Sequence, residues 1–153
     1  MNYGAGQPAS FRAVNQQNWK EWFMKAVKVS VGRQEYYLAF NGEAMFAIRD
    51  KYGDAETLME KMKPDTRESF EIVCDVIALL SEQGELVRRY YGYERADIIK
   101  AEEIRQLAQP ADIIGLKMAI PRAIALGYGR DIEPEKDDEI DLGLVELNQK
   151  KTH

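Results

Sequence analysis

The segment Val27–Gly53 is the part of the sequence whose local structure is most strongly determined. Apolar residues at every second position predict a half-buried first strand: Val27, Val29 and Val31. Gly32 and Arg33 then form a two-residue turn, and glycine at its first position predicts a type II′ hairpin. The return strand, residues 34–40, again alternates, with three apolar side chains on one face: Tyr36, Leu38 and Phe40.

A capped helix is predicted directly after this hairpin. Asn41 is a favoured helix N-cap, and Gly53 suits the left-handed position that follows a helix. The residues between them carry apolar side chains at helical spacing: Met45, Ile48 and Tyr52. The whole unit therefore specifies a piece of fold, and it contains no reactive group that suggests catalysis.

Two helices are predicted between residues 54 and 91. Asp54 begins a short helix that Pro64 ends. Asp65 and Glu68 have the spacing of an acidic capping box before the second helix. That helix has a broad apolar surface, which indicates a central helix packed on more than one side: Phe70, Val73, Val76, Ile77, Leu79 and Leu80. It ends at Gly84 or continues to Tyr91.

Two further helices complete the fold. Residues 100–108 predict one helix with Ile104 and Leu107 inward. Pro110 suits the first turn of the next helix, which Pro121 should kink or divide and which ends by Gly127. The predicted fold class is α+β, mostly α, with an N-terminal β-hairpin followed by a bundle of about five helices.

Composition changes near residues 23 and 131 and predicts three regions. Residues 1–23 form a partly flexible appendage with both tryptophans, residues 24–130 a single helix-rich domain with the hairpin, and residues 131–153 an acidic flexible tail. The aromatic residues of the appendage would fold back onto the domain or dock on another subunit: Trp19, Trp22 and Phe23. The tail closes with an apolar set that is either inert or a short docking segment: Leu142, Leu144, Val145 and Leu147.

Composition also limits the cellular setting. The chain has 153 residues, a net charge of −5 and one cysteine, with no signal peptide pattern and no apolar run of membrane-spanning length. We therefore expect a cytoplasmic protein that does not enter a membrane. An acidic balance disfavours general nucleic-acid binding but leaves room for a local basic patch.

Residues that support catalysis are scarce. The one histidine, His153, is terminal, and Cys74 lies within the apolar central helix, where a buried core residue is expected. Carboxylate pairs such as Glu102 and Glu103 fit a solvated face better than an acid/base dyad. The sequence thus predicts a protein that is not an enzyme and holds no cofactor or metal.

One basic-aromatic cluster lies at residues 88–95. It interleaves three arginines with three tyrosines, and acidic Glu85 and Glu94 lie next to them: Arg88, Arg89, Arg95, Tyr90, Tyr91 and Tyr93. Arginines beside aromatic rings can stack bases or clamp a phosphate, so a small adaptor or regulator that binds nucleic acid is one interpretation. Alternating charge beside tyrosines is also common at protein interfaces, and this second interpretation is preferred.

The order of these elements resembles the bacteriophage tail assembly chaperones of siphophages and prophages. The resemblance runs from Met24 to about Gln149 and lies in the hairpin, in the helix ending Asp50-Lys51-Tyr52-Gly53, and in the stretches 101–104 and 110–127. These are patterns of residue class, and the segment Met1–Phe23 departs from the usual start of the family.

The resemblance implies a role in binding. Such proteins bind the long, aggregation-prone tape measure protein, keep it soluble and help recruit tail-tube subunits, and a homo-oligomer is expected. This role needs exposed apolar or aromatic grooves in acidic surroundings. The residues expected to contact partners are the aromatic arm, the outer face of the hairpin and the basic-aromatic cluster: Trp19, Trp22, Phe23, Tyr37, Arg88, Arg89 and Tyr90.

Overall fold

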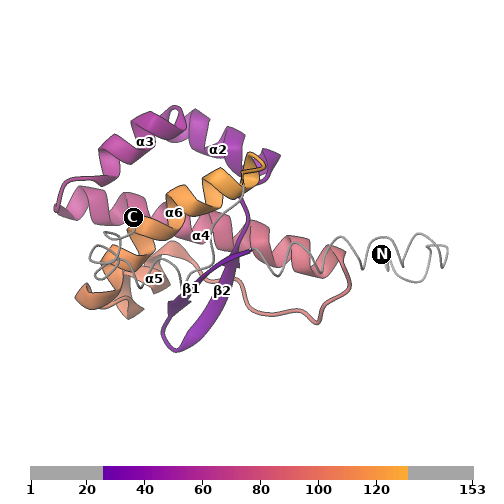
Figure 1. Cartoon of the computed structure of the whole chain (residues 1–153). Coiled ribbons are helices and arrows are strands. Elements are labelled where there is room, and N and C mark those ends of the chain that lie inside the picture. Colours follow the sequence, from indigo (N-terminus) through magenta and orange to yellow (C-terminus); the bar gives the residue numbers. More distant parts are fainter. Residues whose placement is uncertain (1–25, 131–153) are drawn as a thin grey trace, which may run out of the picture.

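The computed structural model describes residues 26–130 as a β-hairpin followed by five helices (Figure 1). Its elements are β1 Val27–Val31, β2 Gln34–Leu38, α2 Gly42–Tyr52, α3 Ala55–Met62, α4 Arg67–Tyr90, α5 Ala101–Leu107 and α6 Pro110–Gly127. The predicted fold class, α+β and mostly α, is confirmed. The aromatic arm and the acidic tail lie outside the described residues.

Helix α4 is the centre of the fold. It contacts β2 and each of the other four helices. In Figure 1, α2 and α3 lie above α4, the hairpin and α5 lie below it, and α6 crosses in front. The broad apolar surface predicted for this helix is accordingly buried, and its fully buried side chains form the middle of the core: Val73, Cys74, Val76, Ile77 and Leu80.

The hairpin has both predicted strands, but β2 ends at Leu38 and not at Phe40, and the turn differs from the prediction. Val27 pairs with Leu38 and Val31 with Gln34, and the three valines of β1 are buried. Gly32 and Arg33 have φ angles of 59° and 73°. Two positive φ angles define a type I′ turn, so the predicted type II′ turn is wrong. A type I′ turn matches the right-handed twist of the strands, and it requires positive φ at both turn positions, so Arg33 takes a positive φ.

Three N-caps begin the helices on the α2–α4 side. Asn41 accepts a hydrogen bond from the Ala44 amide at 3.0 Å, and Asp54 accepts one from Thr57 at 2.8 Å, as predicted. Helix α4 begins one residue later than its predicted box, because extended Thr66, and not Asp65, accepts a hydrogen bond from the Ser69 amide at 3.1 Å.

Helix α4 continues through Gly84, and a close contact with β2 explains why this position is glycine. A Cβ atom built on Gly84 would overlap the carbonyl oxygen of Tyr37 in β2. One turn earlier, the Leu80 carbonyl accepts a hydrogen bond from the Ala39 amide at 3.0 Å. The strand thus runs against the helix backbone, and only glycine gives it room. The helix ends at Tyr90, and Gly92 follows with a φ of 92°.

Two expectations for the last helices need correction. Ile104 is buried, but Leu107 is exposed and covers the hairpin turn, where its Cδ1 would lie 2.9 Å from a Cβ on Gly32. Of the two effects predicted for Pro121, division of the helix is wrong, because α6 is continuous. Pro121 lies on the exposed side, where solvent can satisfy the carbonyl of Lys117 that loses its helical hydrogen bond.

Candidate interaction surface

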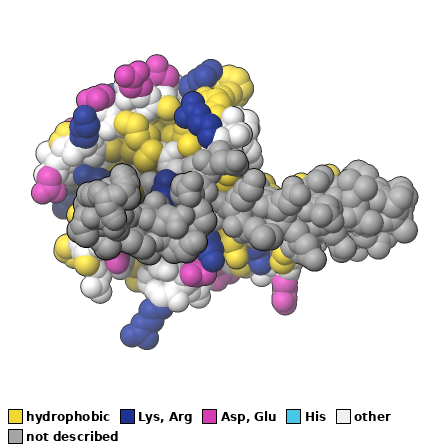
Figure 2. Space-filling model, viewed as in Figure 1, with side chains coloured by type: hydrophobic (Ala, Val, Ile, Leu, Met, Phe, Trp, Pro, Cys, Tyr) yellow, Lys and Arg dark blue, Asp and Glu magenta, His cyan; other side chains and the backbone are white. Residues whose placement is uncertain are grey.

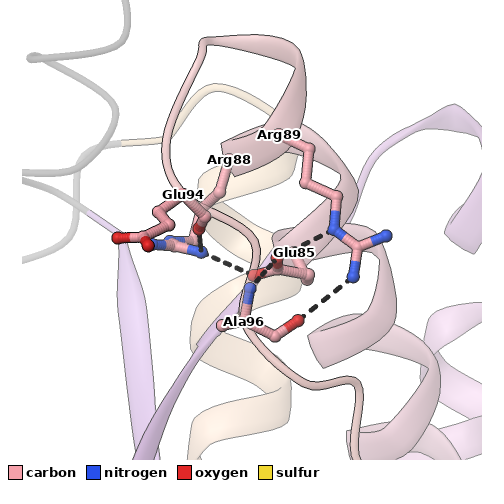
Figure 3. A network of polar contacts seen from close by, with 5 residues as sticks. All are labelled: Glu85, Arg88, Arg89, Glu94 and Ala96. Carbon is pink, nitrogen blue, oxygen red and sulfur yellow. Dashed lines mark hydrogen bonds and ion pairs between the residues drawn. The ribbon is translucent and has the colours of Figure 1, made fainter.

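The basic-aromatic cluster is organised around one buried carboxylate, Glu85 (Figure 3). Its Oε1 accepts a hydrogen bond from Arg88 Nη1 at 2.6 Å. Its Oε2 accepts two, from Arg89 Nε at 2.9 Å and from the Ala96 amide at 2.7 Å. The guanidinium groups extend the network by donating to two backbone carbonyls, of Glu94 at 3.3 Å and Ala96 at 3.1 Å. The network therefore fastens the α4–α5 connection to the last turns of α4.

The electrostatics of Glu85 show how strongly the pair of arginines is engaged. Burial alone would raise the pKa of this carboxyl, but the Ala96 amide and the guanidinium groups of Arg89 and Arg88 more than offset it, and the pKa lies below its ordinary range. The side chains of Arg88 and Arg89 are only 18% and 22% exposed. Because both guanidinium groups already bind the Glu85 carboxylate, the interpretation of the cluster as a phosphate clamp is disfavoured.

The remaining residues predicted to contact partners have different environments. Tyr90 is exposed and packs edge-on against Tyr91, with ring centroids 5.1 Å apart. Tyr37 is half-buried, and Lys28 Nζ lies 5.8 Å from the centroid of its ring. Burial and the charge of the Tyr37 phenolate raise the pKa of Tyr93. Trp19, Trp22 and Phe23 lie outside residues 26–130.

The outward face of α6 exposes several apolar side chains to solvent. Ile114 is 69% exposed, Met118 49% and Tyr128, at the C-cap, 48%. Together with exposed Pro121 and half-buried Ala125 they follow the i, i+4, i+7, i+11, i+14 spacing of one helix face. We call these five residues the α6 stripe. The opposite face of α6 is buried in the core, so the helix is apolar on both sides.

A shallow apolar hollow extends the α6 stripe at its Tyr128 end. Figure 2 shows hydrophobic side chains gathered between the α2–α3 pair and α6. The Tyr128 ring lies 5.5 Å from the Phe40 ring, and its hydroxyl lies 3.5 Å from Met45 Sδ. The hollow is lined by eight residues: Phe40, Met45, Ile48, Arg49, Gly53, Ala55, Ile124 and Tyr128.

The α6 stripe was missed from the sequence although its signal was present. Ile114 and Met118 lie between the core-facing positions of this helix, and they form an i, i+4 apolar pair of their own. A helix that is apolar on two opposite faces is normally covered on both of them. The second apolar face of α6 was therefore the sequence signal for an exposed interaction surface.

The described residues offer little to reaction chemistry. No group of three or more histidine, cysteine, aspartate or glutamate side chains within residues 26–130 is arranged to hold a metal ion. None of the helices in that range is both long enough and apolar enough to cross a bilayer. The Cys74 thiol is buried, and burial raises its pKa to about 11.

We predict that Cys74 is inert toward thiol reagents in the folded protein. At neutral pH its thiolate fraction is negligible and its sulfur is inaccessible, so modification requires unfolding. Labelling with Ellman's reagent should be slow in buffer and immediate in denaturant, with a native rate that tracks protein stability. Fast labelling of the native protein would contradict this assignment of Cys74 to the core.

Comparison with known proteins adds no relative: no family model, no curated protein and no solved structure matches this chain.

Proposed function

We propose that this protein is a non-catalytic tail assembly chaperone of a bacteriophage or prophage, acting in the host cytoplasm. It binds helical segments of the tape measure protein, keeps that protein soluble and helps recruit tail-tube subunits, as a homo-oligomer. The resemblance of the element order to this family motivates the proposal. The structural observation that supports it is the α6 stripe, a solvent-facing apolar helix face adjoined by a hollow.

The shape of the α6 stripe suits one mode of recognition. Its five residues cover about 21 Å along the helix axis at 1.5 Å per residue. An amphipathic helix binds such a surface through anchors at i, i+3 or i+4, and i+7. Tape measure proteins offer many segments of this kind, so one surface would serve repeated, individually weak contacts.

The experiment is co-expression with the tape measure protein encoded nearby in the same phage or prophage genome. The intact chain should increase the soluble fraction of that protein. The double variant Ile114→Ser, Met118→Ser should lose most of this effect, because removal of two anchors costs about 2 kcal/mol, or roughly thirtyfold in affinity.

Leu86→Ser is the matched control, since Leu86 is also exposed but lies on α4. It should retain the solubilising effect. No improvement by the intact chain over an unrelated protein would refute the proposed function, and equal loss in both variants would refute the role of the α6 stripe.

A further inference from the structure

The charged residues that α6 itself places beside the α6 stripe are of one sign. Lys117 and Arg122 are the only charged residues on the outward half of α6. The one acidic residue of the helix, Asp112, lies in its first turn, where its carboxylate accepts a hydrogen bond from the Gln109 amide at 2.8 Å. Arg130 follows the helix and lies over the Tyr128 ring. An occupant of this surface therefore gains from negative charge.

The chain itself contains a segment of that chemistry directly after α6. Residues 131–153 carry eight acidic and three basic side chains, together with a concentrated apolar set: Ile140, Leu142, Leu144, Val145 and Leu147. We propose that this acidic segment docks on the α6 stripe of its own chain. Its apolar set covers Ile114 and Met118 while its carboxylates face Lys117, Arg122 and Arg130.

The length of the chain permits this contact. The segment leaves the described structure at Arg130, two residues beyond Tyr128. Ile114 lies about 21 Å from that end of the helix at 1.5 Å per residue. The ten residues that lead from Asp131 to Ile140 span up to about 33 Å when extended. The apolar set can therefore reach every position of the α6 stripe without unfolding the helix.

Charge also distinguishes this occupant from the aromatic segment at the start of the chain. Residues 1–25 carry three basic side chains and one acidic one, so docking there would bring like charges beside Lys117 and Arg122. A segment that covers the α6 stripe in cis would compete with any partner for it, at a high effective concentration. This inference holds whatever the partner is, and its failure would leave the proposed function standing.

The test uses the full chain with a spin label at Glu146→Cys. Cys74 is buried and stays unlabelled. The label should broaden the methyl signals of Ile114 and Met118 strongly and those of Leu86, which is exposed on α4, weakly. Lys117→Glu should lower the docking equilibrium constant by about fivefold, through loss of one exposed charge contact and its replacement by repulsion.

Arg95→Glu is the matched charge reversal, since Arg95 is exposed on the α4–α5 connection. It should leave the broadening unchanged, and high salt should reduce the broadening in all variants. Equal broadening of Ile114 and Leu86 overturns the proposal. Broadening seen only between differently labelled copies assigns the surface to a second chain, and broadening from a label at Lys20→Cys alone assigns it to residues 1–25; both results also overturn it.

Discussion

Replacement of Gly84 by alanine is expected to lower the free energy of unfolding by about 3 kcal/mol, because the new methyl group overlaps backbone. The Cβ atom would meet the Tyr37 carbonyl oxygen, and a backbone atom cannot rotate away as the end of a side chain can. The helix and β2 must separate, which also strains the hydrogen bond between Ala39 and Leu80. Urea unfolding followed by circular dichroism measures the change.

Gly115→Ala is the matched control, because Gly115 is also inside a helix but has nothing within 4 Å of its Cβ position. There alanine should stabilise the protein by up to about 1 kcal/mol through helix propensity alone. Opposite signs at the two glycines would confirm that Gly84 marks a close approach. Stabilisation at both would show that β2 does not pack on the α4 backbone.

The local parts of the fold could be predicted from the sequence, since their causes lie within a few residues. The alternation in β1 and the caps Asn41 and Asp54 are of this kind, and each is present as predicted. Gly84 is the opposite case. Its local sequence suggests a possible end of the helix, but its actual role depends on Tyr37, which is 47 residues away in sequence. No local pattern contains that information.

The same limit explains the candidate site. In the sequence, Glu85 is one of several charged residues near two arginines. Its role as a buried acceptor for both arginines depends on how the α4–α5 connection folds. The α6 stripe was accessible in principle, because a helix with apolar residues on two opposite faces needs a second partner. The inward face of α6 could be predicted from its apolar spacing, but whether another element covers the opposite face depends on the positions of β1 and α4.

Loss of the Glu85 carboxylate should have the second large effect. Glu85→Ala leaves two guanidinium groups and the Ala96 amide without their shared acceptor, and we expect a loss of about 3 kcal/mol of unfolding free energy. Glu94→Ala is the matched control, because Glu94 contributes its backbone carbonyl, and not its carboxylate, to the network. That variant should unfold like the unmodified protein.

The pH dependence of the Glu85 effect distinguishes a charge network from simple packing. The pKa of Glu85 is lowered in the folded state from its ordinary 4.5, so its stabilisation is complete above the unfolded value and is lost as pH falls through the folded one. The stability gap between the unmodified protein and Glu85→Gln should therefore be widest near neutral pH and shrink in acid. A gap that does not change with pH would mean that Glu85 acts by shape alone. Arg88 and Arg89 would then retain charge for an external phosphate, and the nucleic-acid interpretation would regain its physical basis.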